Sequence, residues 1–280
     1  MKVVTLVHGR RNALANLVRG LEASSLVPEQ LCIVHMNEPA GDWASEVFPI
    51  RELRVEDADG LPLAKARNAV RTLDPSADWV FLDVDCIPTH DLLAQYQQGL
   101  ETHPRALHMG QVRYLPQGAN HAQWHEATLY RDGVEHPLAR YRSGPGQPLP
   151  HHLFWSLNFA CTAATFARIG GFDEGYRGYG GEDTDFAFRA REHGVALIDS
   201  AAMAFHQYHP TYDPPLNHFA DIVENARRFR QRWGVWPMEG WLGAFRDLGL
   251  LHWDEAQLQI IQPPTSEQVA KALNPRRLGF

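Results

Sequence analysis

Two groups of acidic side chains in this sequence follow patterns that suit metal or proton chemistry. The first is Asp83 and Asp85, at the end of an apolar run over residues 78–84. Residues i and i+2 of a strand point to the same side, so both carboxylates can face one hard cation at the end of a sheet strand. The alternative is that one acid caps the next helix and the other lies in a turn, because a lone Asp-x-Asp is short and common.

The second group is Glu182, Asp183 and Asp185, directly after Gly180 and Gly181. Glycines permit a tight turn and a close approach of the backbone, and carboxylates are favoured in the first turn of a helix. The acids can simply favour the helix start. A carboxylate in such a turn can also act as general base on an acceptor hydroxyl, while its neighbour holds other hydroxyls.

Aromatic and imidazole side chains accompany these acids. Tyr176 and Tyr179 flank the glycines and could form a platform for a sugar ring. His206 and His209 follow a predicted strand, and imidazole is a ligand for transition metals. A histidine beside Asp85 would favour manganese over a pure magnesium site. A hydrogen-bonded histidine at a strand end is a serious alternative for His209 and a weaker one for His206.

The elements that must position these residues alternate along the first 110 residues. Apolar, β-branched runs predict strands over residues 2–8, 31–36 and 78–84. Helices are expected over residues 12–24 with Asn12 as N-cap, from Pro62, and from Pro88 and Thr89. This alternation predicts an α/β fold with a mostly parallel central sheet and helices on both faces, which binds ligands at the carboxyl ends of its strands.

The rest of the chain is less regular. Residues 116–150 are rich in Gly, Pro and His without a clear period, which is typical of a functional loop or lid. Residues 153–200 predict strand, short helix, glycine-rich turn, helix and strand, and residues 216–233 predict an amphipathic helix. We therefore expect one domain over residues 1–234, with residues 235–280 as a C-terminal appendage.

Composition limits the classes of partner. The 280 residues carry a formal net charge of −7, which is unlike the basic surface of a nucleic-acid-binding protein. The three cysteines, Cys32, Cys86 and Cys161, are too few and too scattered for a metal or disulfide framework and suit a reducing compartment. No signal peptide or membrane span is evident, so we expect a cytoplasmic protein.

Two stretches resemble a known family. Residues 63–88 (LAKARNAVRTLDPSADWVFLDVDCIP) and 170–191 (GGFDEGYRGYGGEDTDFAFRAR) look like the GT-A glycosyltransferases. They are closest to family 2 and to the C-terminal domain of the β-1,4-galactosyltransferases, whose hallmark is a GGFDE-like stretch leading into GWGGED. Tyr179 replaces the usual tryptophan, which alters stacking on donor or acceptor. The resemblance covers residues 2–210 and implies a nucleotide-sugar half (1–110) and an acceptor half (111–234).

The resemblance also implies roles at the acids and the metal. Asp85 looks like the metal ligand, and Asp83 contacts the nucleotide-sugar. Asp183 is similar to the catalytic base, with Glu182 beside it binding the acceptor. Met203 and His206 reproduce the family's MxxH spacing, which supplies further metal ligands.

The remaining implied roles concern nucleotide and sugar. Arg11 resembles the family's uridine-contacting arginine. Residues Lys65, Arg67 and Asn68 fall where the family contacts nucleotide or diphosphate. The loop of Tyr179, Gly180 and Gly181 would present the acceptor or sugar platform.

These assignments predict a metal-dependent, inverting glycosyltransferase. It would move a hexose (Gal, Glc or N-acetylhexosamine) from a UDP-sugar to a hydroxyl acceptor, with Mn²⁺ preferred and Mg²⁺ as the alternative. A nucleotidyltransferase on the same acids is disfavoured because the N-terminal region lacks a glycine-rich, lysine-containing phosphate loop. A nucleotide-sugar-binding protein without turnover is disfavoured by the intact set of carboxylates and histidine.

Overall fold

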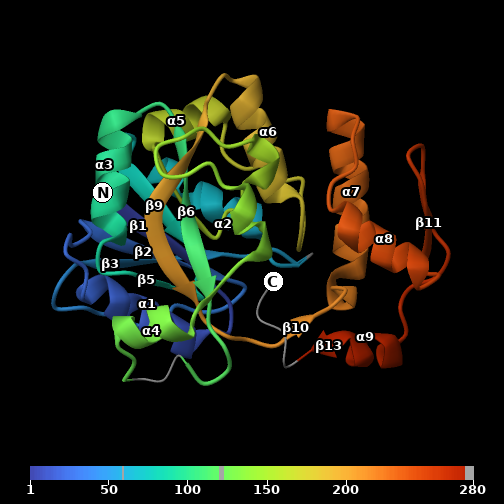
Figure 1. The fold of residues 1–280 in the computed structure, drawn as a ribbon, viewed down its shortest axis with the longest axis horizontal. Helices are drawn as coiled ribbons and strands as arrows, with labels where there is room; N and C mark the ends of the chain where they lie inside the picture. Colours follow the sequence, from blue (N-terminus) through green and yellow to red (C-terminus); the bar gives the residue numbers. More distant parts are fainter. Residues whose placement is uncertain (59, 120–122, 275–280) are drawn as a thin grey trace.

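The computed structural model describes residues 1–58, 60–119 and 123–274. Among these residues, nine strands form one sheet in the order β3-β2-β1-β4-β8-β6-β9-β5, with β7 paired to β6 (Figure 1). The strands are β1 (Lys2–Val7), β2 (Gln30–Met36), β3 (Ile50–Val55), β4 (Asp78–Leu82), β5 (Cys86–Pro88), β6 (Leu107–Tyr114), β7 (Val134–Glu135), β8 (Asn158–Thr162) and β9 (Leu197–His206).

The sheet has a parallel half and a mixed half. Strands β3, β2, β1 and β4 are parallel neighbours. Strand β8 then runs antiparallel to both β4 and β6, whereas β6 and β9 are parallel and β5 is antiparallel to β9. The expected parallel sheet therefore continues into a mixed part that contains both antiparallel and parallel pairs.

Helices cover both faces of the sheet, as the sequence predicts. One face packs on α1 (Arg11–Glu22) and α3 (Leu92–Thr102). The other packs on α2 (Leu63–Asn68), α5 (Ala163–Ile169) and α6 (Glu182–Glu192). Alternate residues of each strand reach the two cores: in β4, Trp79 and Phe81 face α2 and α6, while Val80 and Leu82 face α1 and α3.

Several predicted boundaries are wrong. Helix α1 begins at Arg11, and Asn12 lies inside it, so Asn12 is not the N-cap. Pro88 belongs to β5 rather than to the next helix, which begins at Leu92. The segment between β2 and Pro62, for which no strand was predicted, contains β3, whose alternating polar residues suit an edge strand.

The segment expected to be a lid contains local structure and a firm attachment. It carries α4 (Glu126–Asp132), and its residues 120–122 lie outside the described residues. Its end is fixed to β9, because Arg142 pairs with the fully buried Asp199 and the backbone of Leu149 bonds to Leu197. That residues 116–150 form a mobile segment over the site, which orders when donor or acceptor binds, stays a prediction.

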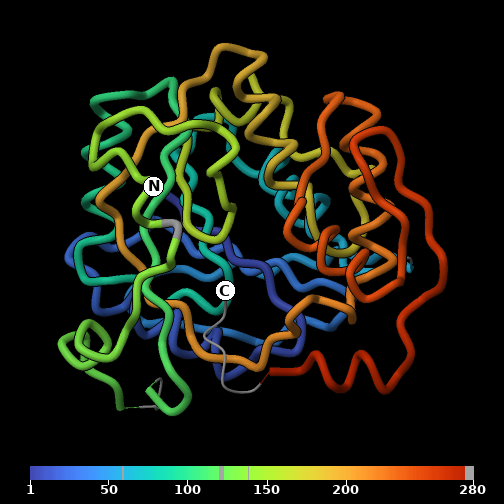
Figure 2. Tube along the Cα trace, turned by 45° about the vertical axis from the view of Figure 1, so that its right-hand side comes forward, coloured from blue at the N-terminus to red at the C-terminus, as the bar shows by residue number. Residues whose placement is uncertain are grey.

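The C-terminal elements gather beside α6 (Figures 1 and 2). They are β10 (Thr211–Tyr212), α7 (Phe219–Trp233), α8 (Glu239–Asp247), β11 (Leu251–Trp253), β12 (Leu258–Ile260), α9 (Ser266–Ala272) and β13 (Leu273–Asn274). Helix α7 shares one apolar cluster with the elements after residue 234, including Leu242, Phe245 and Leu251. It also packs against α6 through Phe229 and Trp233.

Candidate active site

The candidate site forms where β1, β4 and β9 end. Strands β1 and β4 are parallel neighbours, so the residues that follow them emerge at the same edge of the sheet. Strand β5 returns antiparallel to β9, with Cys86 opposite His206. The backbone N–H of Gln207 donates to the carbonyl of Asp85 at 2.7 Å. Sheet pairing thus places the second acid of the DVD sequence beside the histidines after β9.

One carboxylate and two imidazoles form a group that could hold a metal ion. Asp85, His206 and His209 each offer a ligand atom, and these atoms all lie within 4.8 Å of one another. Burial lowers the pKa of His206 to about 4, so its ring is neutral at physiological pH and keeps a lone pair for a metal. A mixed oxygen and nitrogen donor set fits a divalent transition metal better than magnesium, which prefers oxygen alone.

The position of Met203, the remaining expected ligand, follows from its place on β9. It lies on β9 three residues before His206, and residues that far apart on a regular strand point to opposite faces. Met203 instead lines a cavity of about 240 Å³ together with Gln111, Trp155 and Asp199. The MxxH ligand pair stays a prediction, and His209 joins Asp85 and His206 as a third candidate ligand.

Arg10 is the arginine after β1 that contacts Asp85, and the uridine contact expected of Arg11 stays a prediction. Arg10 Nη1 donates to Asp85 Oδ1 at 3.1 Å. Arg11 is exposed at the start of α1, and its guanidinium lies 5.0 Å from the ring centroid of Trp43. Two adjacent arginines after a strand indicate a basic side chain at the sheet edge, but their order in the sequence does not decide which one turns inward.

Arg67 joins the two acidic motifs. Its side chain is buried, and Nη1 donates to Glu182 Oε1 at 3.1 Å. Its Nη2 lies 3.6 Å from Asp83 Oδ1. One guanidinium from α2 therefore fixes Asp83, after β4, relative to Glu182, at the start of α6, although 99 residues separate the two acids in the sequence.

Asp183 has the electrostatic character of a base that works near neutral pH. Burial, followed by the neighbouring Glu182, raises its pKa to about 7, against opposing effects of Arg67 and Thr184. Burial likewise raises the pKa of Asp83 to about 6. A carboxyl group with a pKa near the working pH is both available as a base and strong enough to take a proton.

Lys65 and Asn68 bond to other parts of the chain, and their expected contacts to nucleotide or diphosphate stay predictions. Lys65 Nζ donates to the carbonyl of Glu56 at 2.8 Å, at the rim of a smaller cavity of about 120 Å³. Asn68 is buried, and its amide bonds to the backbone of Phe172 and the carboxylate of Glu174. Asn68 thus holds the loop before α6, while Arg67 alone of the three faces the acids.

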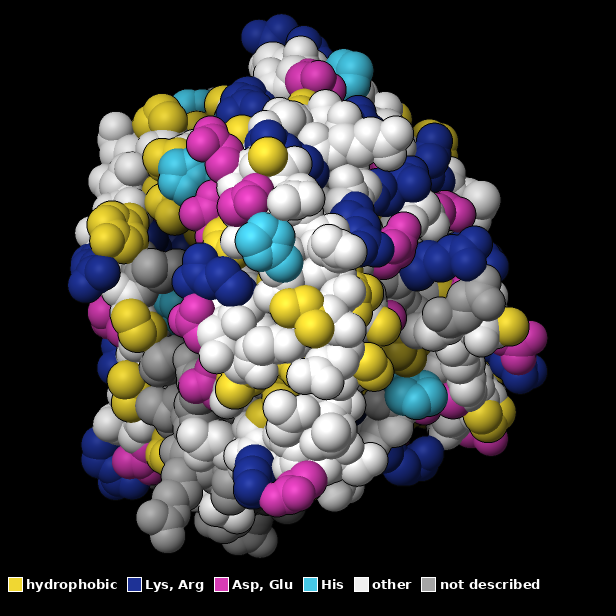
Figure 3. Space-filling model, turned by 90° about the vertical axis from the view of Figure 1, so that its right-hand side faces the viewer, with side chains coloured by type: hydrophobic (Ala, Val, Ile, Leu, Met, Phe, Trp, Pro, Cys, Tyr) yellow, Lys and Arg dark blue, Asp and Glu magenta, His cyan; other side chains and the backbone are white. Residues whose placement is uncertain are grey.

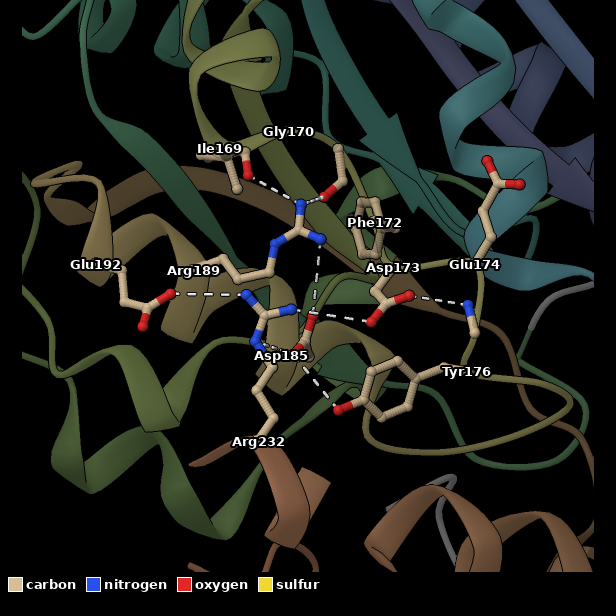
Figure 4. Close-up of polar contacts among 12 residues, drawn as sticks. Ile169, Gly170, Phe172, Asp173, Glu174, Tyr176, Asp185, Arg189, Glu192 and Arg232 are labelled. Atoms are coloured by element: carbon tan, nitrogen blue, oxygen red, sulfur yellow. Dashed lines mark hydrogen bonds and ion pairs between the residues drawn. The ribbon is translucent and has the colours of Figure 1, made fainter. Parts of the chain in front are cut away.

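Asp185, the third acid of the EDTD sequence, connects α6 to α7 (Figure 4). It is fully buried and accepts a hydrogen bond from Trp233 Nε1 at 2.9 Å. Tyr176 Oη donates to the same oxygen at 3.4 Å, and Arg232 Nε lies 3.7 Å away. Tyr176 is therefore committed to the interior and is no sugar platform.

Sequence comparisons find partial similarity to glycosyltransferases. Residues 137–213, which include the GGED turn and β9, match the family model described as the N-terminal domain of galactosyltransferase. Validoxylamine A glucosyltransferase of Streptomyces hygroscopicus is 45% identical over 52 residues, which are 19% of this chain and 12% of that relative's length.

Solved structures show the fold. The crystal structure of GalNAc-T7 with UDP, GalNAc and Mn²⁺ superposes with a TM-score of 0.55 at 16% identity, covering 74% of this chain and 43% of that one. S. aureus TarS 1–349 in complex with UDP gives 0.54 at 12% identity, covering 82% and 65%. The fold is that of the GT-A glycosyltransferases. This confirms the resemblance and the fold class deduced from the sequence.

Within this GT-A fold, no described helix has the length and apolar character needed to cross a membrane. The three cysteines are buried free thiols, as expected.

Proposed function

We propose that this GT-A protein is a metal-dependent, inverting hexosyltransferase that uses a UDP-sugar and a hydroxyl acceptor. The observation that carries the proposal is the meeting of two groups at one sheet edge. Asp85, His206 and His209 form a metal-type cluster, and Arg67 ties Asp83 to the start of the helix that bears Asp183.

The cluster and the base suit the two halves of glycosyl transfer. Negative charge develops on the departing diphosphate as the glycosidic bond breaks, and a divalent cation bound here would supply Lewis-acid stabilisation of that charge. Arg10, at 3.1 Å from Asp85, stands where it can contact the same phosphates. Asp183 takes the proton of the attacking hydroxyl at its carboxylate, while Glu182, fixed by Arg67, orients the acceptor.

Attack from the face opposite the diphosphate inverts the anomeric centre. Inversion needs one base and no enzymic nucleophile, and we assign Asp183, whose pKa is raised to about 7, as that base. Manganese is the proposed cation because the ligands include two imidazoles, and GalNAc-T7 was crystallised with UDP and Mn²⁺. The UDP and UDP-GlcNAc complexes of S. aureus TarS support a uridine nucleotide as carrier.

The proposal is tested by a panel of UDP-sugars with and without Mn²⁺, in which UDP, free hexose and pyrophosphate are all measured. Release of UDP and hexose that requires the metal is expected. Calorimetry should show that Asp85→Asn removes the metal-dependent part of nucleotide binding. Asp247→Asn, at an exposed acid on α8, is the matched control. Equal affinity for UDP with and without Mn²⁺ in the wild-type protein would contradict the metal assignment.

The same measurement distinguishes the alternatives. Pyrophosphate as product would identify a nucleotidyltransferase, and tight binding without any turnover would identify a binding protein. In single-turnover transfer, Asp183→Asn should lower the rate by about 10²–10⁴-fold with donor affinity kept. An Asp183→Asn protein within a few-fold of wild type would remove Asp183 from the mechanism.

A further inference from the structure

The C-terminal elements hold the glycine-rich loop that leads to the proposed base. The side chain of Asn225 on α7 accepts from the backbone N–H of Arg177 at 3.3 Å and donates to its carbonyl at 2.8 Å. The carboxylate of Asp221 accepts from the backbone N–H of Tyr179 at 3.3 Å. The conformation of this loop is therefore determined by α7 as well as by α6.

Two glycines let the loop approach the C-terminal elements this closely. A Cβ atom on Gly178 would lie 2.1 Å from Asp221 Oδ2, and one on Gly180 would lie 2.8 Å from Met238 Sδ. Both residues have positive φ, +60° and +98°. Gly180 thus seats the loop on the segment before α8, rather than forming a surface for the acceptor itself.

This contact assembles three rings from three parts of the chain. Tyr179 stacks on His218 with a centroid distance of 4.6 Å and an interplanar angle of 24°. Its ring centroid also lies 5.7 Å from that of Trp241 on α8, at 30°. Tyr179 remains 40% exposed, so the three rings form an aromatic surface that is open to solvent.

The aromatic surface adjoins the acids of the proposed active site. Tyr179 lies three residues before Glu182, which opens α6. Tyr179 is partly exposed, but desolvation at its hydroxyl end raises the pKa of that hydroxyl, and the charges of Glu182, Asp183 and Asp83 raise it further, which places the hydroxyl near the acid cluster. The polar groups of a molecule that lies against the rings are therefore close to the carboxylate of Asp183.

We propose that Tyr179, His218 and Trp241 form the acceptor subsite and that the acceptor is a polyhydroxylated six-membered ring, a sugar or a cyclitol. The inference rests on the function proposed above. Such a ring presents C–H groups on its face and hydroxyls at its rim. Aromatic surfaces bind the C–H face by dispersion and contact. The hydroxyls at the rim then reach Asp183 and Glu182. The C-terminal elements would then complete the active site.

The test compares Trp241→Ala with Trp241→Phe and with Trp236→Ala, a matched change of a second half-buried tryptophan in the same region. Binding of methyl β-D-glucoside and of myo-inositol is measured by saturation-transfer NMR in the presence of UDP and Mn²⁺. Turnover is measured separately with the same acceptors, and n-octanol and a serine peptide serve as acyclic hydroxyl acceptors.

We expect Trp241→Ala to raise the Kd and KM of the ring compounds at least tenfold while kcat changes little. Trp241→Phe should restore most of the affinity, and Trp236→Ala should match wild type. The proposal is overturned if Trp241→Ala binds the rings within twofold of wild type, or if octanol or the peptide is preferred to both rings. If the ring compounds bind in a way that depends on Trp241 but no sugar is transferred to them, the subsite proposal stands and the transferase function is refuted.

Discussion

At the scale of single residues, the site gathers carboxyl groups whose ionised forms destabilise the folded protein. Glu182, Asp183 and Asp83 lie together with Arg67 as the shared buried cation. A carboxyl whose pKa is raised in the folded state prefers to be protonated there, so its ionised form favours unfolding. The raised pKa of Asp183 is therefore a stability cost at the pH at which the group would act as a base.

Asp183→Asn is expected to raise the melting temperature at pH 8. The folded pKa of about 7 lies above the unfolded value of about 3.9, so the cost is absent below pH 4, grows as the pH rises and is complete above pH 7. The asparagine variant lacks this cost, and its advantage should shrink steadily as the pH falls from 8 to 4. Calorimetric scans at both pH values measure it. A variant less stable than wild type at pH 8 would show that the helix-start contacts of Asp183 outweigh its burial.

The same residue predicts the pH dependence of transfer. Asp183 must be deprotonated to accept the hydroxyl proton, so kcat should rise as the pH increases through about 7 and level off above it. Single-turnover rates between pH 5.5 and 8.5 report this limb directly. A rate that is flat across this range would require a different base.

At the scale of elements, the first turn of α6 is held from two sides. Its first turn carries the acids fixed by Arg67, and Asp185 ties the same turn to Trp233 and Arg232 of α7. Figure 4 shows this second attachment, with Arg189 bonded to the carbonyl of Ile169 at the end of α5. The angle of α6, and with it the position of Asp183, depends on an acid that contacts no proposed ligand.

Asp185→Ala is expected to destabilise the protein by about 3 kcal/mol. The substitution leaves Trp233 Nε1 and the Tyr176 hydroxyl without their acceptor. It also removes the buried carboxylate opposite Arg232. Urea denaturation measures the change. Asp247→Ala is the control, since its pair with Arg246 is exposed and worth little. Equal midpoints for the two variants would mean that the α6–α7 connection contributes no stability.

At the scale of the whole molecule, the C-terminal elements and the sheet domain are joined through α7. This helix packs on α6 through Phe229 and Trp233, and on the elements after residue 234 through Phe219 and Ile222. Figure 3 faces this side of the molecule, where basic and acidic side chains are interspersed rather than separated. Together with the net charge of −7, this gives the visible face no single-sign surface for a polyanion.

A chain that ends at Gly234 is expected to aggregate or lose its cooperative unfolding, because the apolar face of α7 would lose Leu242, Phe245 and Leu251. Size-exclusion chromatography and thermal unfolding test this, with a chain that ends at Asn274 as the control. A monomeric Gly234-terminated protein with unchanged melting temperature would instead support residues 235–280 as a detachable appendage, which is how the sequence divides the chain.

The sequence by itself determined the local elements and the chemical types of the site. Apolar runs of period 2 and 3.6 predict β1, β2, β4, α1 and α7, because these patterns depend only on neighbouring residues. The DVD and GGED motifs identified the carboxylates, and their order along the chain indicated the GT-A fold. The edge strand β3 was missed because its residues are half-polar and lack an apolar run.

Tertiary structure alone decided which of these residues meet. The pairing of β5 with β9 and the loop after β9 brought His206 and His209 to Asp85. The turn after β1 selected Arg10 over Arg11. Tyr179 met Trp241 only because α7 and α8 fold back onto the glycine-rich loop. Asp85 meets His206 and His209, which lie 121 and 124 positions further along the chain. The free energy that selects such contacts comes from the burial of whole elements rather than from any local pattern.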